Sequence, residues 1–218
     1  MAISKVSEKL VLAATGAVLI AFGVSGMEQA EAAQIRNATG LVSPVTRITF
    51  SEVVLPQNTA VTNQYAAFGA TFANLFYSPR NGTGSPNVDA NNLGSFRSGN
   101  SAFNPFSIKF LESRNEAAFA LVTNPGTSTF KALLNGSVVE SFTATTDFTL
   151  ANNFYGFTGI SFDEIQVSGS GNFALLDNLQ LGAATAIPTP ALLPGLVGLG
   201  VAALRKRKAE AAEQASEV

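Results

Sequence analysis

The stretch TFKALLNGSVVESFTA, residues Thr129 to Ala144, decides the fold class of this chain. Asn135 and Gly136 stand between two runs that are rich in β-forming residues. Both residue types tolerate the positive φ that a type I′ turn requires at its two central positions. The stretch therefore predicts a tight β-hairpin that turns at Asn135-Gly136.

Similar short runs, each bounded by Gly, Asn, Pro or Ser, recur between residues 33 and 186. No segment there sustains a helical period over three turns, although Asn58–Phe68 and NNFYGF (152–157) could each hold a helical turn. The pattern predicts an all-β domain built as an antiparallel β-sandwich. The expected strands outside the hairpin are Arg47–Leu55, Gly69–Tyr77, Ser107–Ser113, Ala117–Thr123, ISFDEIQVSG (160–169) and NFALLDNLQLG (172–182).

The segment from Tyr77 to Asn104 differs from the rest of this domain. It is rich in Gly, Asn and Ser and has almost no apolar periodicity. A connection of this length is either a flexible surface loop or a ligand-binding loop, and the sequence favours neither.

Composition excludes several classes of function. The chain of 218 residues has a net charge of −2 and contains no histidine, cysteine or tryptophan. Because residues 33–186 contain no basic patch or charge run, nucleic acid is not an expected partner. Without cysteine or histidine the chain has no thiolate nucleophile, no Ser-His pair and no thiolate or imidazole metal ligand. Residues 33–186 suit a single domain.

Enzymatic chemistry would have to use lysines or carboxylates. A Ser-Lys dyad would need Lys109 or Lys131, which are both expected to face solvent from strands. Paired carboxylates could serve glycoside hydrolysis, but Asp163 and Glu164 are adjacent on a predicted strand and should point to opposite faces. We therefore expect no enzymatic activity. The other acids that could contribute to such a carboxylate pair are Asp89, Glu112 and Glu116.

The N-terminus has the pattern of a secretory signal peptide. Lys5 and Lys9 precede an apolar stretch from Leu10 to Val24, and small residues follow at Ala30 and Ala32. This A-x-A spacing predicts cleavage after Ala32, or one residue later, so residues 1–32 are the predicted signal peptide. A retained membrane helix is the alternative.

The C-terminal segment, 187–218, has the features of a membrane anchor. An apolar run extends to Leu204 and is followed by four cations, Arg205, Lys206, Arg207 and Lys208. As a helix, residues 187–204 would extend about 27 Å, which is just enough to cross the bilayer core. The positive-inside preference would keep the cations in the cytoplasm and the domain outside.

This tail resembles the PEP-CTERM sorting signals of Gram-negative bacteria, in a cyanobacterial PTPA-type variant. The resemblance rests on Pro188, Thr189, Pro190 and Ala191, the Gly-rich apolar run and the basic cluster. It implies recognition and processing by an exosortase, a membrane protease-transpeptidase, and a final location at the cell surface or in the extracellular matrix. Thr189 stands where the usual motif has Glu. A plain C-terminal anchor is the alternative.

The domain resembles the jelly-roll, lectin-like modules that often precede such tails, through ITFSEVV, TAVTNQYAAFGATF and FALLDNLQL. This resemblance implies a jelly-roll-type β-sandwich. A structural or interaction role needs no particular site residues and is the expected function. Binding of extracellular polysaccharide is the alternative. Tyr65, Tyr77 and Tyr155 are the aromatic residues with a polar group that could contact a sugar.

Two acids interrupt apolar rows in the predicted first and last strands. Period-2 alternation places Asp177 in a row with Phe173, Leu175, Leu179 and Leu181, and Glu52 in a row with Ile48, Phe50 and Val54. If these strands pair, the two carboxylates meet and require a compensating charge. Calcium is one candidate, with Asn178 and backbone oxygens completing its shell. An ion pair with Arg47, or strand ends that reach water, are the alternatives.

Overall fold

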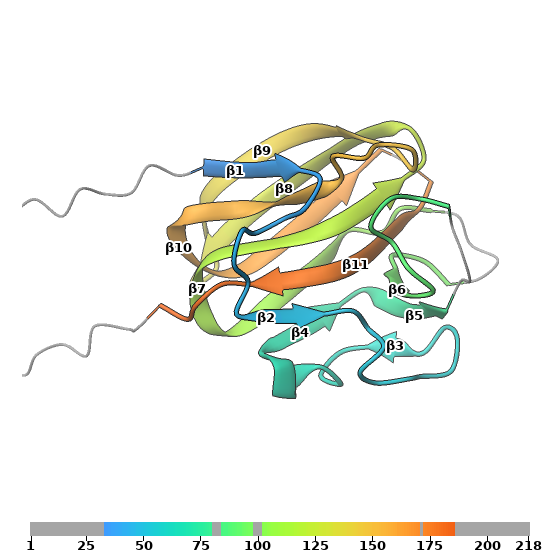
Figure 1. The fold of residues 1–218 in the computed structure, drawn as a ribbon, viewed down its shortest axis with the longest axis horizontal. Helices are drawn as coiled ribbons and strands as arrows, with labels where there is room; N and C mark the ends of the chain where they lie inside the picture. Colours follow the sequence, from blue (N-terminus) through green and yellow to red (C-terminus); the bar gives the residue numbers. More distant parts are fainter. Residues whose placement is uncertain (1–32, 80–83, 98–101, 171, 186–218) are drawn as a thin grey trace, which may run out of the picture.

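The computed structural model describes residues 33–79, 84–97, 102–170 and 172–185. They form an all-β, antiparallel fold with one short 3₁₀ helix (Figure 1). Among these residues no helix is long and apolar enough to cross a membrane. The elements are β1 (Ala33–Asn37), β2 (Thr46–Ile48), β3 (Ala60–Val61), η1 (Ala66–Phe68), β4 (Ala70–Ala73), β5 (Leu75–Pro79), β6 (Asn91–Gly94), β7 (Phe106–Thr123), β8 (Gly126–Leu134), β9 (Ser137–Thr146), β10 (Phe154–Gly169) and β11 (Ala174–Leu181).

Two long strands, β7 and β10, hold the domain together. The first half of β7 pairs with β4 and with the second half of β10, which in turn pairs with β8 and, through it, β9. The second half of β7 pairs with β11 and with the first half of β10, beside which lies β1. Register shifts near Phe162 bend β10 between these two parts. Both strands therefore belong to two layers, consistent with a β-sandwich.

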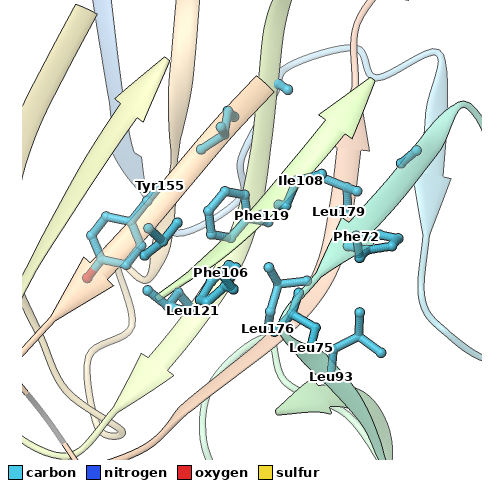
Figure 2. Close-up of a cluster of buried hydrophobic side chains, with 14 of the residues drawn as sticks. Phe72, Leu75, Leu93, Phe106, Ile108, Phe119, Leu121, Tyr155, Leu176 and Leu179 are labelled. Carbon is cyan, nitrogen blue, oxygen red and sulfur yellow. The ribbon is translucent and has the colours of Figure 1, made fainter. Parts of the chain in front are cut away.

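The main hydrophobic core fills the space between the layers. Phe106, Ile108, Phe119 and Leu121 of β7 are at most 3% exposed, and they meet side chains from β4, β5, β6, β10 and β11 there (Figure 2). Aromatic rings supply much of the contact; Phe130 stacks on both Phe142 and Tyr155, with centroids 4.8 Å apart in each pair. The core thus holds without disulfides.

A second, smaller core lies on the opposite face of β7. Its side chains include Ala118 and Ala120 of β7 and Leu175 of β11. They are covered by Leu41, Val88 and Phe96 from the connecting segments. Because both faces of this layer are buried, the second half of β7 lacks the polar alternation of a solvent-facing strand.

The predicted hairpin is confirmed. Asn135 and Gly136 have φ of 51° and 79°, and β8 and β9 pair on either side of them. The turn type follows directly from these two residues.

Several predicted strand boundaries are corrected. The expected strand Arg47–Leu55 stops at Ile48, because Phe50 has a φ of 58°. The expected strand Gly69–Tyr77 is broken at Asn74, whose φ is 60°. Ser107–Ser113 and Ala117–Thr123 are parts of one strand, β7. NNFYGF (152–157) contains the start of β10 and no helical turn, whereas Asn58–Phe68 does contain the turn η1.

Candidate functional site

Asp177 lies in β11 at an irregularity of the strand. The pairing of β11 with β7 shifts register between Asp177 and Gln180, and Asn178 between them has a φ of 48°. This bulge reverses the alternation of side chains, so Leu176, Leu179 and Leu181 face the main core. The predicted single row through Leu175, Asp177, Leu179 and Leu181 is therefore wrong, because Leu175 faces the smaller core.

The carboxylate of Asp177 is fully buried and is held by two backbone groups. Oδ2 accepts a hydrogen bond from the Asp89 N–H at 2.7 Å, and Oδ1 accepts one from the Asn178 N–H at 2.6 Å. Burial raises the pKa of Asp177 to about 7, against the lowering effect of these two hydrogen bonds. The charges of Asp89 and Glu52 add to the increase in this pKa.

Asparagine side chains form hydrogen bonds that hold the loop around Asn87 next to β11. Asn178 Nδ2 donates to the Asn87 carbonyl at 2.8 Å, and Asn87 Nδ2 donates to Asn153 Oδ1 at 2.7 Å. Asn153 in turn donates to the carbonyl of Pro86. Residues 86–89 of the predicted polar loop are thus hydrogen-bonded to β11 and to Asn153, which directly precedes β10.

One polar atom near this loop has no partner. Asn92 is fully buried in β6; its Nδ2 donates to the Asp89 carbonyl at 2.9 Å, but its Oδ1 accepts no hydrogen bond. An unpaired buried oxygen is costly and is usually satisfied by water, an ion or another donor. The oxygen is therefore a possible ligand for a cation in this region.

Glu52 does not face the core, contrary to the prediction. It is exposed, and its Oε1 accepts hydrogen bonds from the Thr49 N–H at 2.8 Å and from the Thr49 hydroxyl at 3.0 Å. The reason is that β2 ends at Ile48 and the positive φ of Phe50 breaks the alternation. The predicted pairing of the strands themselves is confirmed, since Ile48 of β2 lies opposite Leu179 of β11.

Within the described ranges, Arg47 forms no ion pair with either acid, and no three acidic side chains gather closely enough to hold a metal ion. The other alternative is that both acids reach water at strand ends. Glu52 does reach water, but Asp177 does not. Calcium bound through Glu52 and Asp177 stays a prediction. It would depend on amide and backbone oxygens for most of its shell.

The three tyrosines are core residues. Tyr65, Tyr77 and Tyr155 are at most 2% exposed. The Tyr65 hydroxyl lies 3.1 Å from the Phe50 carbonyl oxygen and 2.9 Å from that of Val53, and burial raises its pKa. The expectation that these rings could contact a sugar is therefore wrong.

The remaining candidate acids and lysines have structural partners or face solvent. Glu164 forms an ion pair with Lys109 at 3.5 Å, and Asp163 Oδ2 accepts a hydrogen bond from the Asn135 N–H at 2.9 Å. The register of β10 shifts between Phe162 and Glu164, so the regular alternation behind the prediction of opposite faces does not hold there. Asp163 and Glu164 both border a pocket of about 310 Å³. Lys131 is exposed, as expected.

The predicted signal peptide, 1–32, and the predicted sorting tail, 187–218, lie outside the described residues.

No family model and no curated protein matches this sequence. Among solved structures, a DUF4465 family protein from Bacteroides caccae is 11% identical, with a TM-score of 0.36; the match covers 70% of this chain and 100% of that protein. The C-terminal family 22 carbohydrate binding module of Clostridium thermocellum Xyn10B is also 11% identical, with a TM-score of 0.32, covering 66% of this chain and 95% of the module. Similarities this remote assign no function to the chain.

Proposed function

We propose that this chain is an exported protein of the cell surface or extracellular matrix, processed at its tail by an exosortase-type enzyme, with a structural or interaction role. The proposal depends on the tail motif, Pro188 to Ala191, followed by the apolar run and the cations Arg205 to Lys208. Such a role requires a stable exported domain and no catalytic residues.

The fold supports this proposal. The strand ladders of the described residues lie between Ala33 and Leu181, so they contain no residue of the predicted signal peptide or tail. The start of β1 and the end of β11 lie at the same end of the domain (Figure 1). We also propose that the sandwich is of the jelly-roll type, because β1 and β2 pair with the last two strands, β10 and β11.

Intact-mass measurement of the protein from its native cells tests the processing. We expect a mass that lacks both the signal peptide and most of the tail. A mass that retains residues 192–218 would rule out exosortase-type processing and leave a plain membrane anchor. Neutral substitutions at Arg205 to Lys208 should impair retention before processing, because the cytoplasmic charges resist translocation.

Binding of extracellular polysaccharide is the second candidate. The observation in its favour is a polar row across four strands, in which Ser107, Gln166, Lys131 and Ser141 are successive cross-strand neighbours. Three of them, with Asn74 and Ser168, border a pocket of about 330 Å³. Polar side chains in register can form several hydrogen bonds with sugar hydroxyls. A glycan array probed with the wild type and with Gln166→Ala tests this; binding of the same glycans by both proteins would exclude the row.

We propose in addition that a structural calcium ion binds beside Asp177. The charges of Glu52 and Asp89 both act on the buried carboxylate, and the Asn92 Oδ1 is unpaired. A cation would relieve the repulsion among the acids and could accept that oxygen as a ligand. The test by calcium removal is described in the Discussion.

A further inference from the structure

Arg114 is a buried cation away from the sites described above. It lies at the centre of β7, opposite Phe162 of β10, and forms an isolated bridge with Ala184 on its other side. Only 9% of the residue is exposed. Arginines this deeply buried are normally paired with a carboxylate, because removing a guanidinium from water is unfavourable.

The guanidinium of Arg114 has almost no partners in the described part of the chain. Its Nη1 donates to the Gly182 carbonyl at 3.1 Å, its Nε is buried without an acceptor, and no carboxylate lies within ion-pair distance. A guanidinium can donate five hydrogen bonds, so most of this capacity is unused. No ion pair of the described residues compensates its charge directly, although Glu112 borders the same pocket.

A pocket of about 390 Å³ opens beside this guanidinium. Its wall includes Thr46, Phe68, Gly69, Leu111, Glu112 and Arg114. Gly69 ends the helix η1 with a φ of 92°, and a Cβ at this position would lie 2.9 Å from Arg114 Nη2. Because Gly69 has no side chain, nothing at position 69 covers Nη2 of the guanidinium.

We infer that this pocket binds the carboxylate of an acidic sugar, such as a uronic acid unit of an extracellular polysaccharide. A guanidinium is the side chain best suited to carboxylate oxygens. Glu112 on the same wall repels a bare anion but can accept hydrogen bonds from sugar hydroxyls, which favours a uronic acid over a simple ion. Phe68 offers an apolar surface to the sugar ring. The inference depends on the second proposed function, polysaccharide binding, and specifies its ligand at a site distinct from the polar row.

The experiment is calorimetric titration of the purified full chain with trigalacturonate and with the neutral analogue trigalactose. We expect trigalacturonate to bind and trigalactose not to bind, since the two differ in the carboxylates. Arg114→Gln can keep the hydrogen bond to Gly182 but removes the charge, and should weaken trigalacturonate binding at least about 10-fold. Arg47→Gln, which removes an exposed arginine next to Thr46, should change it less than about 2-fold.

Several results would each overturn the inference. They are the absence of trigalacturonate binding to the wild type, equal binding by Arg114→Gln, or an equal loss in Arg47→Gln. Equal binding of both trisaccharides would support polysaccharide binding but reject the carboxylate site. The experiment therefore distinguishes failure of this inference from failure of the proposed function. Because the comparison of the two sugars uses the wild type, it remains decisive even where Arg114→Gln does not fold.

Discussion

Asp177 accepts a hydrogen bond at 2.7 Å from the backbone N–H of Asp89, a residue 88 positions earlier in the chain. This bond joins the last strand to the polar segment that precedes β6, and it does so through a carboxylate with no exposure to water. The stability of this junction therefore depends on the protonation state of one side chain.

The first prediction concerns the pH dependence of stability. The pKa of Asp177 is about 7 in the folded protein against 3.8 in the unfolded chain, so folding takes up a proton between these values. The contribution is full below about pH 4 and is lost as pH rises to about 7. In buffer freed of calcium beforehand, urea unfolding should show a loss of about 2 kcal/mol between pH 5 and pH 7.

Asp177→Asn is the control for this prediction, because it removes the titration with little change in shape. Its stability should fall less between pH 5 and pH 7 than that of the wild type. Identical pH profiles for the two proteins would show that Asp177 does not titrate in this range.

The second prediction concerns calcium. At pH 7.5, addition of calcium at about 100 times its Kd should stabilise the wild type by about 2.7 kcal/mol, because the ion binds the folded state. EGTA should reverse the increase, and Asp177→Asn should show no increase. A Tm that is indifferent to calcium and EGTA in both proteins would leave Asp177 held by its two backbone hydrogen bonds alone.

The third prediction tests how closely β7 and β10 approach each other. A Cβ on Gly156 of β10 would lie 2.0 Å from the Ala117 carbonyl oxygen and 2.7 Å from the Ala118 Cα, both in the backbone of β7. Since neither atom can move without distorting the ladder, Gly156→Ala should cost more than about 3 kcal/mol and is expected to prevent stable folding.

Gly136→Ala provides the comparison for Gly156→Ala in thermal unfolding. Gly136 has a φ of 79° in the hairpin turn, but a Cβ there would meet no atom within 4 Å. Its cost should be about 1 kcal/mol, from backbone strain alone. If the two variants lose equal stability, the close approach at Gly156 is not a constraint on the fold.

The features that local sequence predicts are those in which a few adjacent residues determine the geometry. The Asn135-Gly136 turn is the clearest example, because both positive φ angles belong to residue types that favour them. The all-β class follows in the same way from short runs between turn residues. The single strand β7 is missed because Ser113 and Asn115 are typical turn residues and indicate a boundary between two runs, although both lie within β7.

The candidate sites depend on distant residues, which is why the sequence predicts them less well. Period-2 alternation misplaces the partners of Asp177, since the bulge at Asn178 reverses the faces. The strand β6, Asn91–Gly94, has no β-rich sequence and is recognisable only by its pairing with β5 and β11. No sequence pattern singles out Arg114, because the absence of a carboxylate beside its guanidinium, among the described residues, depends on how distant residues pack.

The last prediction concerns the segment that replaces the second half of the expected strand Arg47–Leu55. The Tyr65 hydroxyl lies within hydrogen-bond distance of the Phe50 and Val53 carbonyl oxygens, while its ring packs edge-on against Phe50 with centroids 5.1 Å apart. Tyr65→Phe keeps the ring but removes the donor beside the buried Phe50 carbonyl and the partly buried Val53 carbonyl, which should cost about 1–3 kcal/mol in urea unfolding.

Tyr77→Phe is the matched control for Tyr65→Phe, since it also removes one hydroxyl from a buried ring. The Tyr77 hydroxyl donates to Asn91 Oδ1 at 3.0 Å and also has a backbone hydrogen bond with Leu55, which is only partly buried. The Asn91 side chain keeps its second bond, to the Ser51 hydroxyl. The Asn91 amide can turn toward another donor or water, whereas the Phe50 and Val53 carbonyls are fixed in the backbone. The loss should therefore be smaller, about 1 kcal/mol or less. A loss from Tyr65→Phe that is no larger than the loss from Tyr77→Phe would mean that Tyr65 stabilises the segment through its ring, and that its hydroxyl contributes little.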